Sequence, residues 1–128
     1  MVKATTQSIE VIVECKYLAN QSSPKENLYF FVYFITIINN SQYTVQLLKR
    51  HWDITDSNGD KRTVDGDGVV GETPVLEPGE TFQYNSGCNF LTEIGYMKGY
   101  YTMKRLVDNV EFKIDIPKFD LVVPAKLN

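Results

Sequence analysis

The residues that could do chemistry gather between Arg50 and Pro74, a stretch that holds the only histidine and the only tryptophan of the chain. His51 is the one candidate general base. Because side chains alternate along a strand, we expect Trp52 to pack in a core and His51 to point outward or into a loop-lined hollow. No nucleophile elbow or paired motif accompanies His51, so the sequence favours a protein that is not an enzyme.

Carboxylates are dense in the same stretch and could supply oxygen ligands to a hard divalent cation. They are Asp53, Asp56, Asp60, Asp65, Asp67 and Glu72. Their order does not match an EF-hand, because the glycine comes too early and no glutamate closes the loop. Two interpretations remain: solvated turn residues, or a metal site whose ligands the sequence leaves unknown. No cofactor is indicated.

Gly66, Gly68 and Gly71 have the GxGxxG spacing that lets a backbone approach a pyrophosphate at a helix N-terminus in dinucleotide-binding folds. Here Val69 and Val70 inside the motif are β-branched and Pro74 comes three residues after the last glycine, so no helix is expected, and the flanking aspartates would repel a phosphate. We therefore predict that at least one of these glycines has a positive φ in a turn. A nest of backbone N–H groups that binds an anion is the alternative.

These residues define one candidate surface, formed by the loops of residues 57 to 74. Its candidate binding residues are His51, Asp56, Asp65, Gly66, Asp67, Gly68, Gly71 and Glu72. The preferred interpretation is a binding module that recognises an unknown protein partner. The alternative is a small-ligand module that takes a divalent cation or a phosphate or pyrophosphate compound at the same loops.

Composition limits the fold and the partners. The 128 residues suit one domain, 1–128, and eight tyrosines with seven phenylalanines favour pleated sheets. A net charge of -3 gives no strong positive field, so nucleic acid is not an expected partner. No apolar run is long enough to span a membrane and the first residues carry no export signal, so we expect a cytoplasmic protein that does not enter membranes.

Hydrophobic alternation predicts the strands that position these residues. Strands are expected at 9–17, 28–38, 44–56, 61–65, 81–86, 95–107 and 110–116. A type I′ hairpin is expected at 57–60 and a break in pairing at 65–68. Pro117 is expected either to end the last strand or to place it at the edge of a sheet. No window shows helical periodicity. About seven short strands with turn signals predict an all-β fold, one antiparallel β-sandwich.

The two cysteines have no CxxC spacing, so neither a redox motif nor a zinc knuckle is indicated. Cys15 lies in an alternating strand pattern and is expected as a small core residue. Cys88 is expected to be the more exposed of the two and the better candidate for a reactive thiol. Both are predicted to be free thiols in a reducing compartment.

Several longer segments resemble one known family. They are the inward set Phe31, Tyr33, Ile35 and Ile37 with Asn39, then VQLLKRHWDITDSNG, VDGDGVVGETPVLEPGE, YNSGC, GYMKGYYTM, IPKFDL and the terminal Leu127-Asn128. Over nearly the whole chain these motifs resemble the ApaG family. The resemblance implies an immunoglobulin-like or fibronectin-III-like sandwich. It implies little about function beyond a loose link to cobalt resistance and magnesium efflux, and it favours protein binding because similar eukaryotic domains belong to an F-box protein and a polymerase-delta-interacting protein.

The strand at 28–38 carries two apolar sets that cannot both face one core. The set that matches the family pattern is placed inward, which leaves Phe30, Val32, Phe34 and Ile38 on an outer face. That face is either shielded by the chain ends or forms a contact with another molecule. We predict weak self-association through Phe30, Val32 and Phe34.

Overall fold

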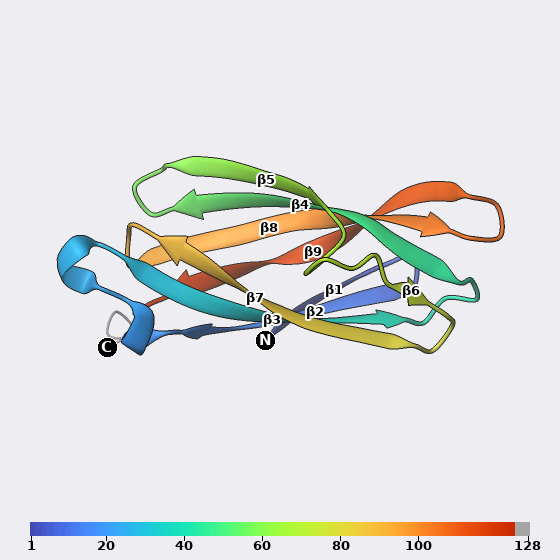
Figure 1. Cartoon of the computed structure of the whole chain (residues 1–128), viewed down its shortest axis with the longest axis horizontal. Coiled ribbons are helices and arrows are strands. Elements are labelled where there is room, and N and C mark those ends of the chain that lie inside the picture. Colours follow the sequence, from blue (N-terminus) through green and yellow to red (C-terminus); the bar gives the residue numbers. More distant parts are fainter. Residues whose placement is uncertain (125–128) are drawn as a thin grey trace.

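The computed structural model describes residues 1–124, which form two antiparallel sheets packed face to face (Figure 1). The elements are β1 (Val2–Thr6), β2 (Ile9–Tyr17), the 3-10 turns η1 (Ala19–Gln21) and η2 (Pro24–Glu26), β3 (Tyr29–Asn39), β4 (Val45–Asp56), β5 (Lys61–Asp67), β6 (Val75–Leu76), β7 (Thr81–Phe90), β8 (Ile94–Arg105) and β9 (Val110–Val122). One sheet has the order β1-β2-β3-β7 and the other β5-β4-β8-β9, with β6 paired to β4. The predicted antiparallel β-sandwich is confirmed.

The core lies between the sheets and is built by strand alternation. On β3 the odd-numbered residues from Tyr29 to Asn39 are buried, and the even-numbered ones are half-buried or exposed. Tyr33, Trp52 and Phe119 come from both sheets and pack ring against ring, with centroids 5.3 to 5.9 Å apart. Trp52 is only 2% exposed, which confirms its predicted place in the core.

Two short strands were not predicted. β1 pairs with β2 along its whole length, but most of its side chains are exposed, so its sequence shows no alternation. The connecting turn has positive φ at Gln7 (48°) and Ser8 (63°), without the glycine or asparagine that usually marks such a turn. β6 has only two residues, too few for any period to show.

The predicted break at 65–68 is absent, and of the two alternatives expected for Pro117 the edge strand is the one observed. β5 continues through Asp67, and residues 65 to 67 pair with β4 where a break was expected. β9 runs on through Pro117 to Val122. Pro117 is accommodated because β9 is an edge strand and its register with β8 shifts between Met97 and Gly99, so no ladder bond is required of the proline.

The hairpin between β4 and β5 is not a type I′ turn. Gly59 has φ +90°, but neither Ser57 nor Asn58 has a positive φ. The Gly59 amide donates to the Asp56 carbonyl (3.1 Å), and the Asp56 amide donates to the Asp60 carbonyl (2.9 Å). These bonds close a three-residue loop with glycine in the left-handed position, the next most common way of joining two antiparallel strands.

The expected order of exposure of the cysteines is wrong. Cys15 is exposed, because β2 leaves the core after Val13, and its thiol donates to the Asp120 carbonyl at 3.3 Å. Cys88 is half-buried and packs against the core cluster.

No helix within residues 1–124 has the length and hydropathy needed to cross a membrane.

Candidate functional site

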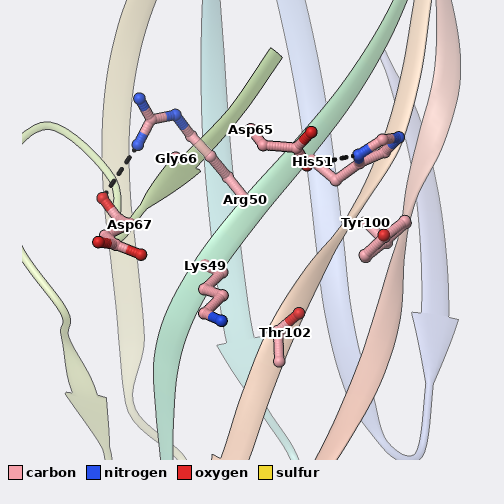
Figure 2. Close-up of a pocket in the computed structure, with 8 residues that line it drawn as sticks. All are labelled: Lys49, Arg50, His51, Asp65, Gly66, Asp67, Tyr100 and Thr102. Carbon is pink, nitrogen blue, oxygen red and sulfur yellow. Dashed lines mark hydrogen bonds and ion pairs between the residues drawn. The ribbon is translucent and has the colours of Figure 1, made fainter. Parts of the chain in front are cut away.

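The outer face of the β5-β4-β8 sheet holds a hollow of about 410 Å³, which we call the His51 hollow. Figure 2 shows its lining, which comes from three neighbouring strands: Lys49, Arg50, His51, Asp65, Gly66, Asp67, Tyr100 and Thr102. Register brings these side chains together. His51 lies opposite Asp65 on one side and Tyr100 on the other, and Lys49 is likewise flanked by Asp67 and Thr102.

His51 is held at both ring nitrogens by carboxylates. Its Nδ1 lies 2.7 Å from Asp65 Oδ1 and its Nε2 lies 3.2 Å from Asp53 Oδ1. The ring also stacks on Tyr100, with centroids 4.6 Å apart and planes 15° from parallel. The hydrogen bond that the protonated ring donates to Asp65 raises the pKa of His51 above its usual value; partial burial opposes the rise and Asp53 adds to it. The surroundings of His51 therefore favour the protonated form of its ring.

Within residues 1–124, the hydrogen-bond partners of the His51 ring are the carboxylates of Asp65 and Asp53, and no hydroxyl or thiol is among them. Neither cysteine lines the hollow, and its one hydroxyl besides Tyr100, that of Thr102, has no hydrogen bond to His51 among those found in residues 1–124. Burial raises the pKa of the Cys88 thiol, although Arg62 opposes this, and burial likewise raises the pKa of Cys15. Neither thiol is activated, because reactive cysteines need a lowered pKa.

Gly66 makes room for Arg50. The two residues are cross-strand partners, and a Cβ on Gly66 would lie 2.6 Å from the Arg50 Cζ. The Arg50 Nη1 donates to the carbonyls of Asp67 (3.0 Å) and Gly68 (2.9 Å), as Figure 2 shows for Asp67. The first glycine of the GxGxxG spacing thus serves an arginine contact inside a strand.

The other two glycines serve turns. Gly68 has φ +63° and Gly71 has φ +80°, which confirms the prediction of positive φ. Val69 and Glu72 exchange hydrogen bonds of 2.8 and 2.9 Å around a two-residue turn in which Val70 also has positive φ, 43°. The Gly68 amide donates to a β4 carbonyl at 2.7 Å. Because three of the loop's amides already have partners, few remain to form an anion-binding nest.

The predicted surface of loops 57 to 74 is divided by the structure. β5 has seven residues, so its ends lie about 20 Å apart. The structure brings His51, Asp65, Gly66 and Asp67 into one hollow. Gly68, Gly71 and Glu72 lie in the loop beyond β5, and Asp56 lies at the opposite end, beside the hairpin. Their roles in binding remain predictions.

Lys49, Tyr100 and Thr102 were not foreseen as part of the site. Alternation alone places them on the outer faces of β4 and β8, but which residues meet across strands depends on register. A bulge between Leu47 and Lys49 sets that register between β4 and β8. The sequence gives no signal for this bulge.

The carboxylates between Asp53 and Glu72 do not come together in one metal-binding group. Among residues 1–124 no group of three or more histidine, cysteine, aspartate or glutamate side chains is arranged to hold a metal ion. Asp65 Oδ1 and Asp53 Oδ1 are already directed at His51. A divalent cation would have to displace those contacts.

The outer face of β3 is the second predicted surface. Phe34 is 43% exposed, and Phe30 and Val32 are half-buried, whereas Phe31 and Tyr33 are buried. The predicted facing of the two sets is therefore confirmed. Self-association through the outer set remains a prediction.

Comparison with known proteins gives consistent matches. Residues 19–105 match the family described as the ApaG domain. Protein ApaG of Brucella canis is 53% identical over 98% of this chain and 96% of its own length, and that of Brucella abortus (strain S19) is 52% identical over the same shares. The crystal structure of the putative ApaA protein from Bordetella pertussis superposes with a TM-score of 0.88 at 38% identity, covering 94% of this chain and 97% of that one.

Proposed function

Because the chain belongs to the ApaG family, we propose that it is a non-enzymatic binding module whose His51 hollow receives part of another protein. The observation that carries the proposal is the arrangement of His51, Asp65, Lys49 and Tyr100 in register on three rigid strands. Sites built on strands hold their side chains more firmly than sites on loops, so this face offers a preformed surface.

The chemistry of the hollow suits a protein partner. Lys49 stands beside the carboxylates of Asp65 and Asp67, so both signs of charge are presented within one hollow, and the raised pKa of His51 favours its positive form there. Mixed charges steer an approaching partner and fix its orientation. Tyr100 adds a flat ring, which is the kind of side chain enriched at interfaces.

Small ligands are the competing function and have less support. A phosphate or pyrophosphate would meet the carboxylates of Asp65 and Asp67. In the 68–72 loop, three of the five backbone amides already donate to carbonyls. A divalent cation would find no assembled ligand group within the described part of the chain. We therefore propose that any role in cobalt resistance or magnesium efflux is indirect and acts through binding of another protein in the cytoplasm.

Capture from a cell extract tests this proposal. Immobilised wild-type protein is compared with Lys49→Glu, which reverses a charge in the hollow, and with Lys98→Glu, which makes the same change on an exposed residue of the same sheet outside the hollow. We expect a protein retained by the wild type and Lys98→Glu and lost with Lys49→Glu. If all three retain the same proteins, the hollow is not the binding surface.

A further inference from the structure

Within residues 1–124, β1 and β7 end one sheet and β5 and β9 end the other, and β7 differs from the other three. Edge strands normally carry charged residues or proline that discourage pairing with another chain. β1 contains Lys3, β5 contains Lys61 and Arg62 among other charges, and β9 contains Pro117. β7, with the sequence TFQYNSGCNF, has ten residues and neither a charge nor a proline. Of these four strands it is the one without such protection, and β6, which also flanks β4, has only two residues.

The free edge of β7 can be located residue by residue. The Phe30 amide donates to Ser22 Oγ (2.9 Å) and its carbonyl accepts from the Leu18 amide (2.8 Å), so both groups of Phe30 point away from β7. Its partner Asn89 is therefore in a non-hydrogen-bonded pair, and by alternation Gly87 and Asn85 are as well. These residues direct their amides and carbonyls away from β3.

A cleft of about 380 Å³ opens between this edge and β5. Its walls are residues 86 to 89 of β7 together with Arg62 and Val64 of β5, and its floor includes Trp52. Side chains alternate faces along a strand. A strand added to β7 would therefore send every second side chain into the cleft.

The cleft contains two arginines without acidic partners. Arg50 lines it and bonds backbone carbonyls, and the Arg62 Nη2 donates to the Asn89 carbonyl and contacts the Cys88 sulfur. Within residues 1–124 the ion pairs are those of His51 with its two aspartates and of Arg105 with Asp108, so neither cleft arginine has a carboxylate. A guanidinium group matches a carboxylate in charge and geometry.

We propose that β7 accepts an extended segment of a partner protein as an added strand, with an aspartate or glutamate of that segment seated between Arg50 and Arg62. Main-chain hydrogen bonds to Asn85, Gly87 and Asn89 hold such a strand, and the cleft selects its side chains. Arg62 releases the Asn89 carbonyl, which then accepts from the added strand. This inference rests on the proposed role as a protein-binding module; its cleft shares Arg50, and no other lining residue, with the His51 hollow.

The probe is a synthetic peptide of alternating valine and glutamate, with a second peptide in which glutamine replaces glutamate. Binding is followed by amide NMR spectra of the folded protein. We expect the acidic peptide to shift the amides of Asn85, Gly87 and Asn89 and to slow their hydrogen exchange. The glutamine peptide should bind about tenfold more weakly, because it loses a charge-assisted hydrogen bond.

Three variants complete the test. Arg62→Gln should weaken binding of the acidic peptide about tenfold, whereas the matched control Lys104→Gln, on β8 and away from the cleft, should not. Asn85→Pro removes one outward amide and should abolish binding; if it does not fold, Arg62→Gln still decides.

Three results would overturn the inference. Equal affinity of the acidic and glutamine peptides would remove the role of the arginines. Shifts at Lys49 and Tyr100 in place of β7 would also refute it while leaving the proposed function intact. Shifts of β7 amides with protein concentration alone would mean that a second copy of the chain, not a partner segment, covers this edge.

Discussion

Replacing Val70 by asparagine should stabilise the protein. Val70 and Gly71 are the two central residues of the turn closed by Val69 and Glu72, and both have positive φ. A β-branched residue is a rare occupant of this region, because its side chain crowds the backbone. Asn-Gly is the preferred pair for a two-residue turn with positive φ at both positions.

The size of the effect follows from the backbone angle and the exposure. A left-handed conformation costs an ordinary residue about 1–2 kcal/mol, and asparagine lowers much of that cost because its short side chain bonds locally. Val70 is 55% exposed, so the substitution sacrifices little apolar burial. We expect a net gain of about 1 kcal/mol, which in a chain of this size raises the melting temperature by about 3–5 °C.

Thermal and urea unfolding of wild type and Val70→Asn measure this gain. Val70→Ala is the control, because it removes the branched side chain but has no preference for positive φ, and its gain should be smaller. Val69→Ala, at a fully buried position of the same turn, should instead destabilise. An unchanged or lower melting temperature for Val70→Asn, or equal gains for asparagine and alanine, would refute the reasoning from φ.

Three further predictions concern the core, the hollow and the β3 face. Trp52→Ala should destabilise the protein by about 3–5 kcal/mol in a thermal melt, since it removes a buried ring; a nearly unchanged melt would contradict the packing. NMR titration should give His51 a pKa above 6.5 that Asp65→Asn lowers. The stability that this pair adds is then fully present below pH 6.5 and is lost as the pH rises through the raised pKa of the folded protein; a wild-type pKa at or below 6.5 would disprove it. Sedimentation over a range of concentrations should show weak self-association that Phe30→Ser with Phe34→Ser abolishes, and a strict wild-type monomer would end that idea.

The strands of the core were predictable because one buried face imposes a period of two. On β3 this period, together with the family resemblance, placed Phe31 and Tyr33 inward and Phe34 outward, as observed. The facing of Trp52 and His51 followed from the same alternation. For such residues the physical cause, burial of one sheet face, leaves a visible mark in the sequence.

The features that were missed depend on partners distant in sequence. Asp65-Gly66-Asp67 has the composition of a loop, yet it is part of a strand because its residues pair with Lys49, Arg50 and His51 of β4. Cys15 continues an alternating pattern but lies where β2 leaves the core. The His51 hollow depends on the register between β4 and β8, which is set by a bulge. No local sequence pattern indicates this bulge.

Isothermal titration provides the most direct test of protein binding through the His51 hollow. The wild-type protein is titrated with the partner recovered from the extract and, separately, with magnesium, cobalt and pyrophosphate. We expect a binding isotherm with the partner that Lys49→Glu abolishes and Lys98→Glu preserves, and no heat of binding with the two cations or with pyrophosphate. Saturable binding of a cation or pyrophosphate that is lost with Lys49→Glu, without any protein isotherm, would contradict the proposed function.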